Sequence, residues 1–148
     1  MGRKTILLVE DNAGAVQLSL IAFKESAVPC NVVVMLDGVE ALDYIFAGGK
    51  YRDKQRAMPE VILLDLKLPG MSGHEVLKKI REAHSTRLIP IIIFSVSNEE
   101  TDRKICYELG ANSYIKKPVD FEKYIEIVRM LGNYWLKLNE PPPRTAQG

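Results

Sequence analysis

The chain has 148 residues, a hydrophobic fraction of 47% and a formal net charge of +1. This length suits one domain with its own core, and the composition excludes a disordered, collagen-like or coiled-coil protein. The balanced charge gives no bulk basic surface for nucleic acid. The longest apolar run, residues 32–36, is too short for a membrane span, which needs about 20 residues. Since Cys30 and Cys106 form no CxxC pair and no signal peptide is evident, we expect a cytoplasmic protein without membrane partners.

Short runs of branched apolar residues alternate along the chain with segments of helical periodicity. The expected strands are residues 6–9, 32–36, 61–64, 91–94 and 113–115. Runs that are apolar on both faces are typical of parallel strands buried between helices. Between them, apolar residues recur at helical spacing, and the last such segment reaches residue 138. This alternation predicts an α/β fold, a doubly wound parallel sheet with five strand–helix repeats and helices on both faces.

Capping residues and polar segments mark the boundaries of these elements. Asn12 is expected to cap the first helix, and Ser72 with Glu75 predicts a capping box at the third. Residues 48–59 are polar and predict a long surface loop. We expect the domain to span residues 1–138 with an extended last helix, and residues 139–148 to form a Pro-rich, extended or mobile tail.

Polar side chains follow four of the predicted strands, at the point where each strand ends. They are Glu10 and Asp11 after the first strand, Asp65 after the third, Ser95 at the end of the fourth and Lys117 after the fifth. The carboxyl ends of parallel strands meet at one edge of a sheet, so these groups should converge. Clustered carboxylates repel one another unless a cation intervenes, and oxygen ligands suit Mg²⁺. Such a site could use a carboxylate as the nucleophile toward phosphorus, with the lysine neutralising the phosphoryl charge.

These motifs resemble the receiver domain of two-component response regulators. The resemblance covers about residues 4–131 and rests on residues 6–11, residues 63–73, Ser95 and the Lys117–Pro118 pair. Counted from Asp65, the positions of Ser95, Tyr114 and Lys117 lie 30, 49 and 52 residues further on, a spacing similar to the family pattern. The resemblance implies a flavodoxin-like fold with strand order 2-1-3-4-5 and five helices.

The resemblance also implies a role for each acidic residue. Asp65 is expected to be the phosphoacceptor. Glu10, Asp11 and Asp65 are expected to bind Mg²⁺, with the backbone carbonyl of Lys67 completing the protein ligands.

Lys117 is expected to contact the phosphoryl group and to precede a cis peptide bond to Pro118. Ser95 and Tyr114 are the implied switch residues. Ser95 would move toward the phosphoryl oxygens, and Tyr114 would swing from an exposed to a buried rotamer. The surface made by the fourth helix, fifth strand and fifth helix would then change shape.

Within the family, residues 48–59 and the ending 133–138 are similar to stand-alone regulators paired with bacterial phytochromes. This likeness implies a single-domain regulator that accepts its phosphoryl group from a phytochrome-type histidine kinase and signals by protein contacts, without turning over a substrate. A homodimer would use the C-terminal end or the surface of the fourth helix, fifth strand and fifth helix. The other interpretation of Trp135, packing of the last helix on the core, stays open.

Several alternatives remain. The kinase could be a sensor unrelated to phytochromes, and the fold could serve as an adaptor without phosphorylation. The protein could also be an aspartate-nucleophile phosphohydrolase, but such enzymes commonly place a second Asp where this chain has Lys67. Val96 could shield an acyl phosphate from water, and Ser97 cannot readily act as a base. We therefore hypothesise a long-lived phosphoryl state.

Overall fold

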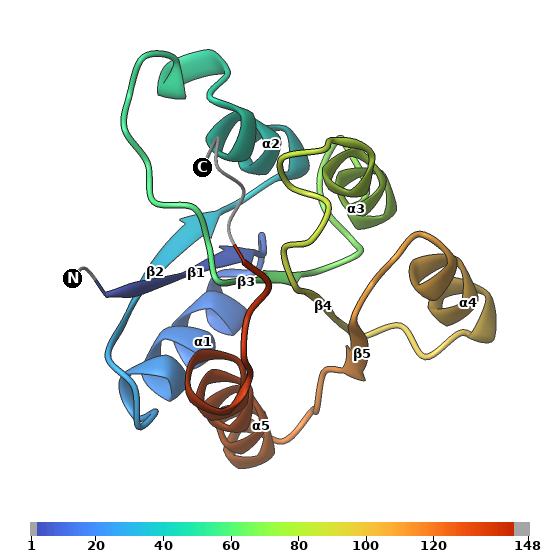
Figure 1. The fold of residues 1–148 in the computed structure, drawn as a ribbon. Helices are drawn as coiled ribbons and strands as arrows, with labels where there is room; N and C mark the ends of the chain where they lie inside the picture. The colour runs from blue at the N-terminus through green and yellow to red at the C-terminus, as the bar shows by residue number, and fades with distance from the viewer. Residues whose placement is uncertain (1–2, 144–148) are drawn as a thin grey trace.

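A computed structural model of the chain describes residues 3–143. Five parallel strands form one sheet in the order β2-β1-β3-β4-β5 (Figure 1). The strands are β1 (Lys4–Val9), β2 (Cys30–Met35), β3 (Val61–Leu64), β4 (Ile91–Ser95) and β5 (Ser113–Lys116). The helices are α1 (Ala13–Lys24), α2 (Gly38–Phe46), α3 (Gly73–Glu82), α4 (Glu100–Glu108) and α5 (Phe121–Asn133). The expected doubly wound fold and strand order are confirmed.

Alternate residues of the central strands face opposite sides of the sheet and build two cores. Leu7 and Val9 pack in the core under α2, α3 and α4, whereas Ile6 and Leu8 pack in the core under α1 and α5. Figure 1 shows α1 and α5 together on one side of the sheet, with α2 and α3 on the other. Burial of strands on both faces is what the continuous apolar runs predicted. Within residues 3–143 no helix is long and apolar enough to span a bilayer.

The predicted caps are present. The side chain of Asn12 accepts a hydrogen bond from the Ala15 N–H at 2.9 Å, and Ser72 Oγ accepts one from the Glu75 N–H at 3.3 Å. Both side chains satisfy N–H groups that a helix start leaves without partners. These caps fix where α1 and α3 begin, directly after the segments that follow β1 and β3.

The segment between α2 and β3 is tied to α2 rather than detached from it. A 3-10 turn occupies Gly49–Tyr51. The Arg56 guanidinium donates to the carbonyl oxygens of Tyr44 and Ile45, and the Tyr44 hydroxyl donates to the Ala57 carbonyl at 2.7 Å. The expected loop is therefore anchored at its second half.

The last helix ends differently from the expectation of one continuous helix to residue 138. Beyond α5 the chain widens into a π-helical segment, Tyr134–Leu138, which the Asn139 N–H closes on the Tyr134 carbonyl at 2.7 Å. In this segment Leu136 is buried, and its carbonyl accepts a hydrogen bond from Lys4 Nζ at 2.6 Å. Trp135 packs against the core under α1 and α5.

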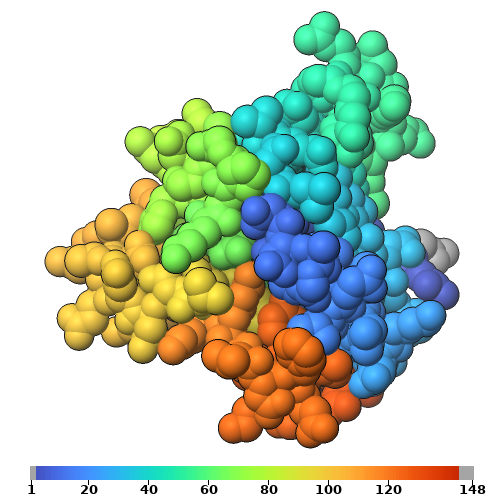
Figure 2. All heavy atoms as spheres, turned by 180° about the vertical axis from the view of Figure 1, so that it is seen from behind, coloured from blue at the N-terminus to red at the C-terminus, as the bar shows by residue number. Residues whose placement is uncertain are grey.

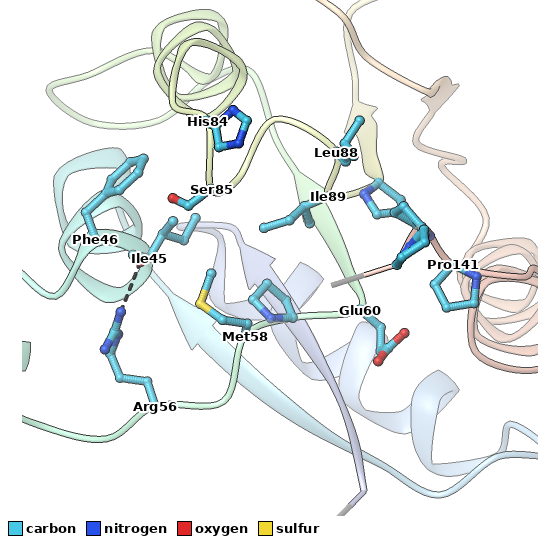
Figure 3. Close-up of a pocket in the computed structure, with 14 residues that line it drawn as sticks. Ile45, Phe46, Arg56, Met58, Glu60, His84, Ser85, Leu88, Ile89 and Pro141 are labelled. Carbon is cyan, nitrogen blue, oxygen red and sulfur yellow. Dashed lines mark hydrogen bonds between the residues drawn. The ribbon is translucent and has the colours of Figure 1, made fainter. Parts of the chain in front are cut away.

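Three prolines at the end of the described chain form one wall of a cavity of about 400 Å³ (Figure 3). The other walls come from the end of α2, from residues 56–60 and from the segment that joins α3 to β4. Pro141–Pro143 thus lie against the domain, and residues 144–148 of the expected tail fall outside the described residues.

Candidate metal centre

Three carboxylates meet at the carboxyl edge of the sheet. Glu10 and Asp11 directly follow β1, and Asp65 directly follows the neighbouring strand β3. The last residues of the two strands, Val9 and Leu64, are paired, so Glu10 and Asp65 begin at the same level. One oxygen of each carboxylate lies within 4.8 Å of the others. Glu10 and Asp65 are buried, whereas Asp11 is exposed. Figure 2 looks onto this side of the molecule, where the segments after β1 (blue), β3 (green) and β5 (orange) come together.

A buried lysine reaches the same point from β5. The Lys117 backbone N–H donates to the Ser95 carbonyl at 2.8 Å, which fixes the start of its side chain beside β4. Its ammonium group then contacts Glu10 Oε1 and lies 3.0 Å from Asp65 Oδ2. Lys117 is therefore the cation of the site in this structure, and it pairs with two of the three carboxylates.

The electrostatics follow from burial and from these contacts. Burial raises the pKa of Glu10, because the charged carboxylate loses water, and this outweighs the opposing effect of Lys117. Burial alone would lower the pKa of Lys117, but the Glu10 and Asp65 carboxylates raise it above its ordinary value. The lysine is consequently held in its charged form between its two partners.

Asp65 is positioned by a close backbone approach that no larger residue would allow. A Cβ atom on Gly73 would lie 2.2 Å from the Asp65 carbonyl oxygen and 2.7 Å from the Leu66 Cα. The Gly73 N–H donates to the Leu66 carbonyl at 2.9 Å, and the Lys67 N–H donates to Asp65 Oδ1 at 3.3 Å. The start of α3 is thereby packed directly under the candidate phosphoacceptor. Gly73 lies within the motif of residues 63–73, but the sequence alone does not show this close approach.

Ser97 forms a hydrogen bond with each of the two expected switch residues, Ser95 and Tyr114. Ser95 is buried at the end of β4, and its Oγ accepts a hydrogen bond from the Ser97 N–H at 3.2 Å. Tyr114 is half-buried on β5, and its hydroxyl donates to the Ser97 carbonyl at 3.0 Å. Burial raises the pKa of Tyr114, so this hydroxyl keeps its hydrogen for donation.

One expected feature of the site is wrong. Within residues 3–143 no peptide bond is cis, so the bond between Lys117 and Pro118 is trans. A trans X–Pro bond is intrinsically favoured by about 0.5–1 kcal/mol. Lys117 reaches Glu10 and Asp65 from this trans backbone, so no other isomer is needed to place its ammonium group.

Fold and site together define a class of protein, a doubly wound α/β domain with an acidic cluster and a paired lysine at the carboxyl edge of its sheet. Residues 6–129 match the family model of the response regulator receiver domain, and the chain belongs to that family. The likeness to regulators of phytochromes is confirmed by its relatives.

Three relatives illustrate how far the similarity extends. The phosphorylated cyanobacterial phytochrome response regulator RcpA is 37% identical, with a TM-score of 0.89 over 96% of this chain and 100% of its own. The Mn²⁺-bound form of response regulator Rcp1 is 31% identical, with a TM-score of 0.88 over 95% of this chain and 99% of its own. The probable methanogenesis regulatory protein FilR2 of Methanothrix harundinacea is 37% identical over 93% of this chain and 86% of its own.

Proposed function

We propose that this response regulator accepts a phosphoryl group on Asp65 from a histidine kinase and signals by changed protein contacts. The observation that carries the proposal is the placement of Asp65, buried at a strand end with Oδ2 3.0 Å from the ammonium group of Lys117. A carboxylate held beside a fixed cation is suited to attack an anionic phosphoryl group, because the cation offsets the charge that both partners carry.

The transfer step involves one bond formed and one bond broken. An oxygen of Asp65 attacks the phosphorus of a phosphohistidine and forms the P–O bond of an acyl phosphate. The P–N bond breaks, and its electron pair stays on the imidazole nitrogen, which then takes up a proton. Lys117, already in contact with Asp65, neutralises part of the charge on the transferred group.

The donor set fits a hard divalent cation, which we propose to be Mg²⁺. Carboxylate oxygens from Glu10, Asp11 and Asp65 lie within 4.8 Å of one another, and Lys117 fills part of this site as a monovalent cation. These residues, with the backbone carbonyl of Lys67, would hold the ion. When bound, it supplies further neutralisation of the phosphoryl oxygens. The related Rcp1 structure described as Mn²⁺-bound supports a divalent site in this family.

We further propose that Ser95 and Tyr114 carry the signal outward. Ser95 Oγ accepts from Ser97, so its own hydrogen is free to be donated to a phosphoryl oxygen. If the phosphoryl group makes such contacts in only one arrangement of the β4–α4 segment, phosphorylation raises the population of that arrangement. The affected surface of α4, β5 and α5 carries exposed apolar side chains, among them Tyr107, Val119 and Phe121, which suit a kinase or a second copy of the chain.

The partner and setting are also proposals. The similarity to a phytochrome response regulator supports a phytochrome-type kinase as the phosphodonor. Free thiols at Cys30 and Cys106 are consistent with the reducing cytoplasm. We propose that residues 1–138 act as the receiver domain, and that a homodimer uses the α4–β5–α5 surface or the C-terminal end.

The test is phosphorylation by a small acyl-phosphate donor in the presence of Mg²⁺, followed by intact mass and oligomeric state. We expect one stable added phosphoryl group, absent in Asp65→Asn and absent without Mg²⁺. The matched control is Asp53→Asn, which alters an exposed aspartate in the α2–β3 loop and should behave like the wild type. Continuous hydrolysis of the donor or of small phosphate esters, without an adduct, would instead favour the phosphohydrolase alternative.

A further inference from the structure

Ser97 is the centre of a hydrogen-bond network between the site and α4. Its N–H donates to Ser95 Oγ at 3.2 Å, and its carbonyl accepts from the Tyr114 hydroxyl at 3.0 Å. Its hydroxyl donates to Asp102 Oδ2 at 2.5 Å and accepts from the Glu99 N–H at 3.3 Å. Both switch side chains thus depend on where this one residue is held.

Asp102 holds Ser97 from the first turn of α4, and a residue of α3 faces the same carboxylate. His74 Nε2 lies 3.5 Å from Asp102 Oδ1, the oxygen that Ser97 does not use. The Nε2 atom is buried and has no hydrogen-bond partner among the described residues, and Asp102 Oδ1 is an acceptor within 3.5 Å of it. Such an atom gains most from an acceptor within reach.

We infer that His74 is a positioning residue of the switch, which acts through Asp102 on Ser97 and so orients Ser95 and Tyr114. This inference rests on the proposed function for its consequence, but the network itself is present without a phosphoryl group. It assigns a role to the start of α3, which carries Gly73 under Asp65 and His74 beside Asp102. One helix end thereby contacts both the candidate phosphoacceptor and the segment that responds to it.

The physical argument concerns how the network restrains the β4–α4 segment. Glu99, the N-cap residue of α4, makes no side-chain capping bond, so the start of this helix depends on Asp102, Ser97 and the Arg103–Asn98 contacts. A carboxylate with a hydrogen bond at one oxygen and a close contact at the other has fewer orientations than one held at a single oxygen. Loss of the His74 contact should therefore free Asp102, loosen Ser97 and leave the Ser95 hydroxyl less well aimed.

The first measurement uses a probe that the chain already contains. Cys106 is the fully buried residue of α4, one turn after Asp102, so its rate of alkylation reports local opening of this helix. In a Cys30→Ser background, we expect His74→Asn to raise this rate about two- to fivefold, because the 3.5 Å contact with Asp102 is lost. His74→Gln places an amide nitrogen where Nε2 lies and should restore a rate near that of wild type.

The second measurement asks whether the network reaches the site. With a small acyl-phosphate donor, we expect the phosphorylation rate to fall several-fold in His74→Asn and to recover in His74→Gln, with the Mg²⁺ affinity unchanged in both. In an Asp102→Ala background, His74→Asn should add no further effect on either rate. Urea unfolding of each variant separates local opening from a general loss of stability.

The outcomes are distinct from those of the proposed function. Equal alkylation rates in wild type, His74→Asn and His74→Gln would overturn the inference, as would a loss in His74→Asn that His74→Gln does not rescue. Altered alkylation with unaltered phosphorylation would overturn the role in the switch. If the wild type itself takes up no phosphoryl group, the proposed function fails, and the alkylation rates still decide whether His74 holds Asp102.

Discussion

The ammonium group of Lys117 contacts Glu10 and lies 3.0 Å from Asp65 Oδ2, so one side chain joins the acids that follow β1 and β3. The third acid, Asp11, lies with these two in the same carboxylate cluster. Lysine and a divalent ion would consequently compete for the same carboxylate oxygens. The effect of this competition can be measured as a change in Mg²⁺ affinity when the lysine is replaced.

Removing the lysine should separate metal binding from phosphoryl acceptance. Without metal, Lys117→Met leaves two buried carboxylates unpaired and should lower the free energy of unfolding by about 3–5 kcal/mol. The Mg²⁺ affinity should rise on the order of tenfold, since a competing positive charge is gone, while phosphorylation slows. Calorimetric titration with Mg²⁺ checks this, and Lys116→Met, an exposed neighbour, is the control. An unchanged affinity would contradict competition at these oxygens.

The exposed member of the cluster allows a test of repulsion between the acids. In EDTA, Asp11→Asn should raise the free energy of unfolding by about 1 kcal/mol, because one of three neighbouring negative charges is removed at a solvated position. Saturating Mg²⁺, about 100 times its Kd, should stabilise the wild type by about 2.7 kcal/mol and the variant far less. Urea unfolding with and without Mg²⁺ measures both effects. Equal stabilisation of both proteins would exclude Asp11 as a ligand.

The close approach of α3 to Asp65 predicts a steric effect at Gly73. Gly73→Ala brings a methyl group 2.2 Å from the Asp65 carbonyl oxygen, so backbone must shift. We expect a loss of about 1–3 kcal/mol in stability and slower phosphorylation. Gly14→Ala is the matched control, since it also lies in the first turn of a helix but would contact Asn12 Oδ1 at 3.3 Å. Equal stability of the two variants would show that α3 can move away freely.

The two thiols should differ in reactivity. Burial, with a smaller effect of Asp102, raises the pKa of Cys106 to about 11, so at pH 8 only about one thiol in a thousand is ionised. Cys30 is half-exposed and should react first with a disulfide reagent at pH 8, whereas Cys106 should react only as α4 opens. Raising the pH from 8 to about 9 should speed the Cys106 reaction, because the thiol exposed by opening ionises near its ordinary pKa. Simultaneous reaction of both thiols in the folded protein would contradict this order.

The hypothesis of a long-lived phosphoryl state depends on Val96. This side chain directly follows Ser95, which is buried at the end of β4, and is itself 54% exposed. Val96→Ala should shorten the lifetime of the phosphorylated protein several-fold by admitting water. The lifetime follows from intact mass at successive times after removal of the donor. Val119→Ala, at a position 92% exposed, should have no effect, and an unchanged lifetime in Val96→Ala would refute the shielding role.

The sequence predicted the strands best where both faces are buried. All residues of β3 and β4 are buried, and their apolar runs placed them correctly. The edge strand β2 begins at Cys30 rather than Val32, because pairing with Lys4 and Thr5 extends it into less apolar residues. Convergence of Glu10, Asp11 and Asp65 could be predicted because parallel strands end at one edge.

Contacts between helices could not be predicted in the same way. The contact of His74 with Asp102 is one example, since sequence periodicity does not show which side chains of two helices meet. Arg81 is a second example, because its guanidinium joins the carbonyls of Ile89 and Gly110 to the side chain of Asn112. Both depend on how α3 approaches its neighbours, which is set by packing of the whole domain.

The hydrogen bond from Lys4 Nζ to the Leu136 carbonyl bears on how the polypeptide could be reconnected. It holds the beginning of the first strand against the end of the last helical segment. Because these two segments are neighbours, a short linker could join them and new termini could be opened elsewhere, which is a circular permutation. The exposed residues 52–55 lie between the 3-10 turn and Arg56 and offer a place for that opening. A permuted chain would carry fused reporters on the α2–β3 loop instead of at the C-terminal end.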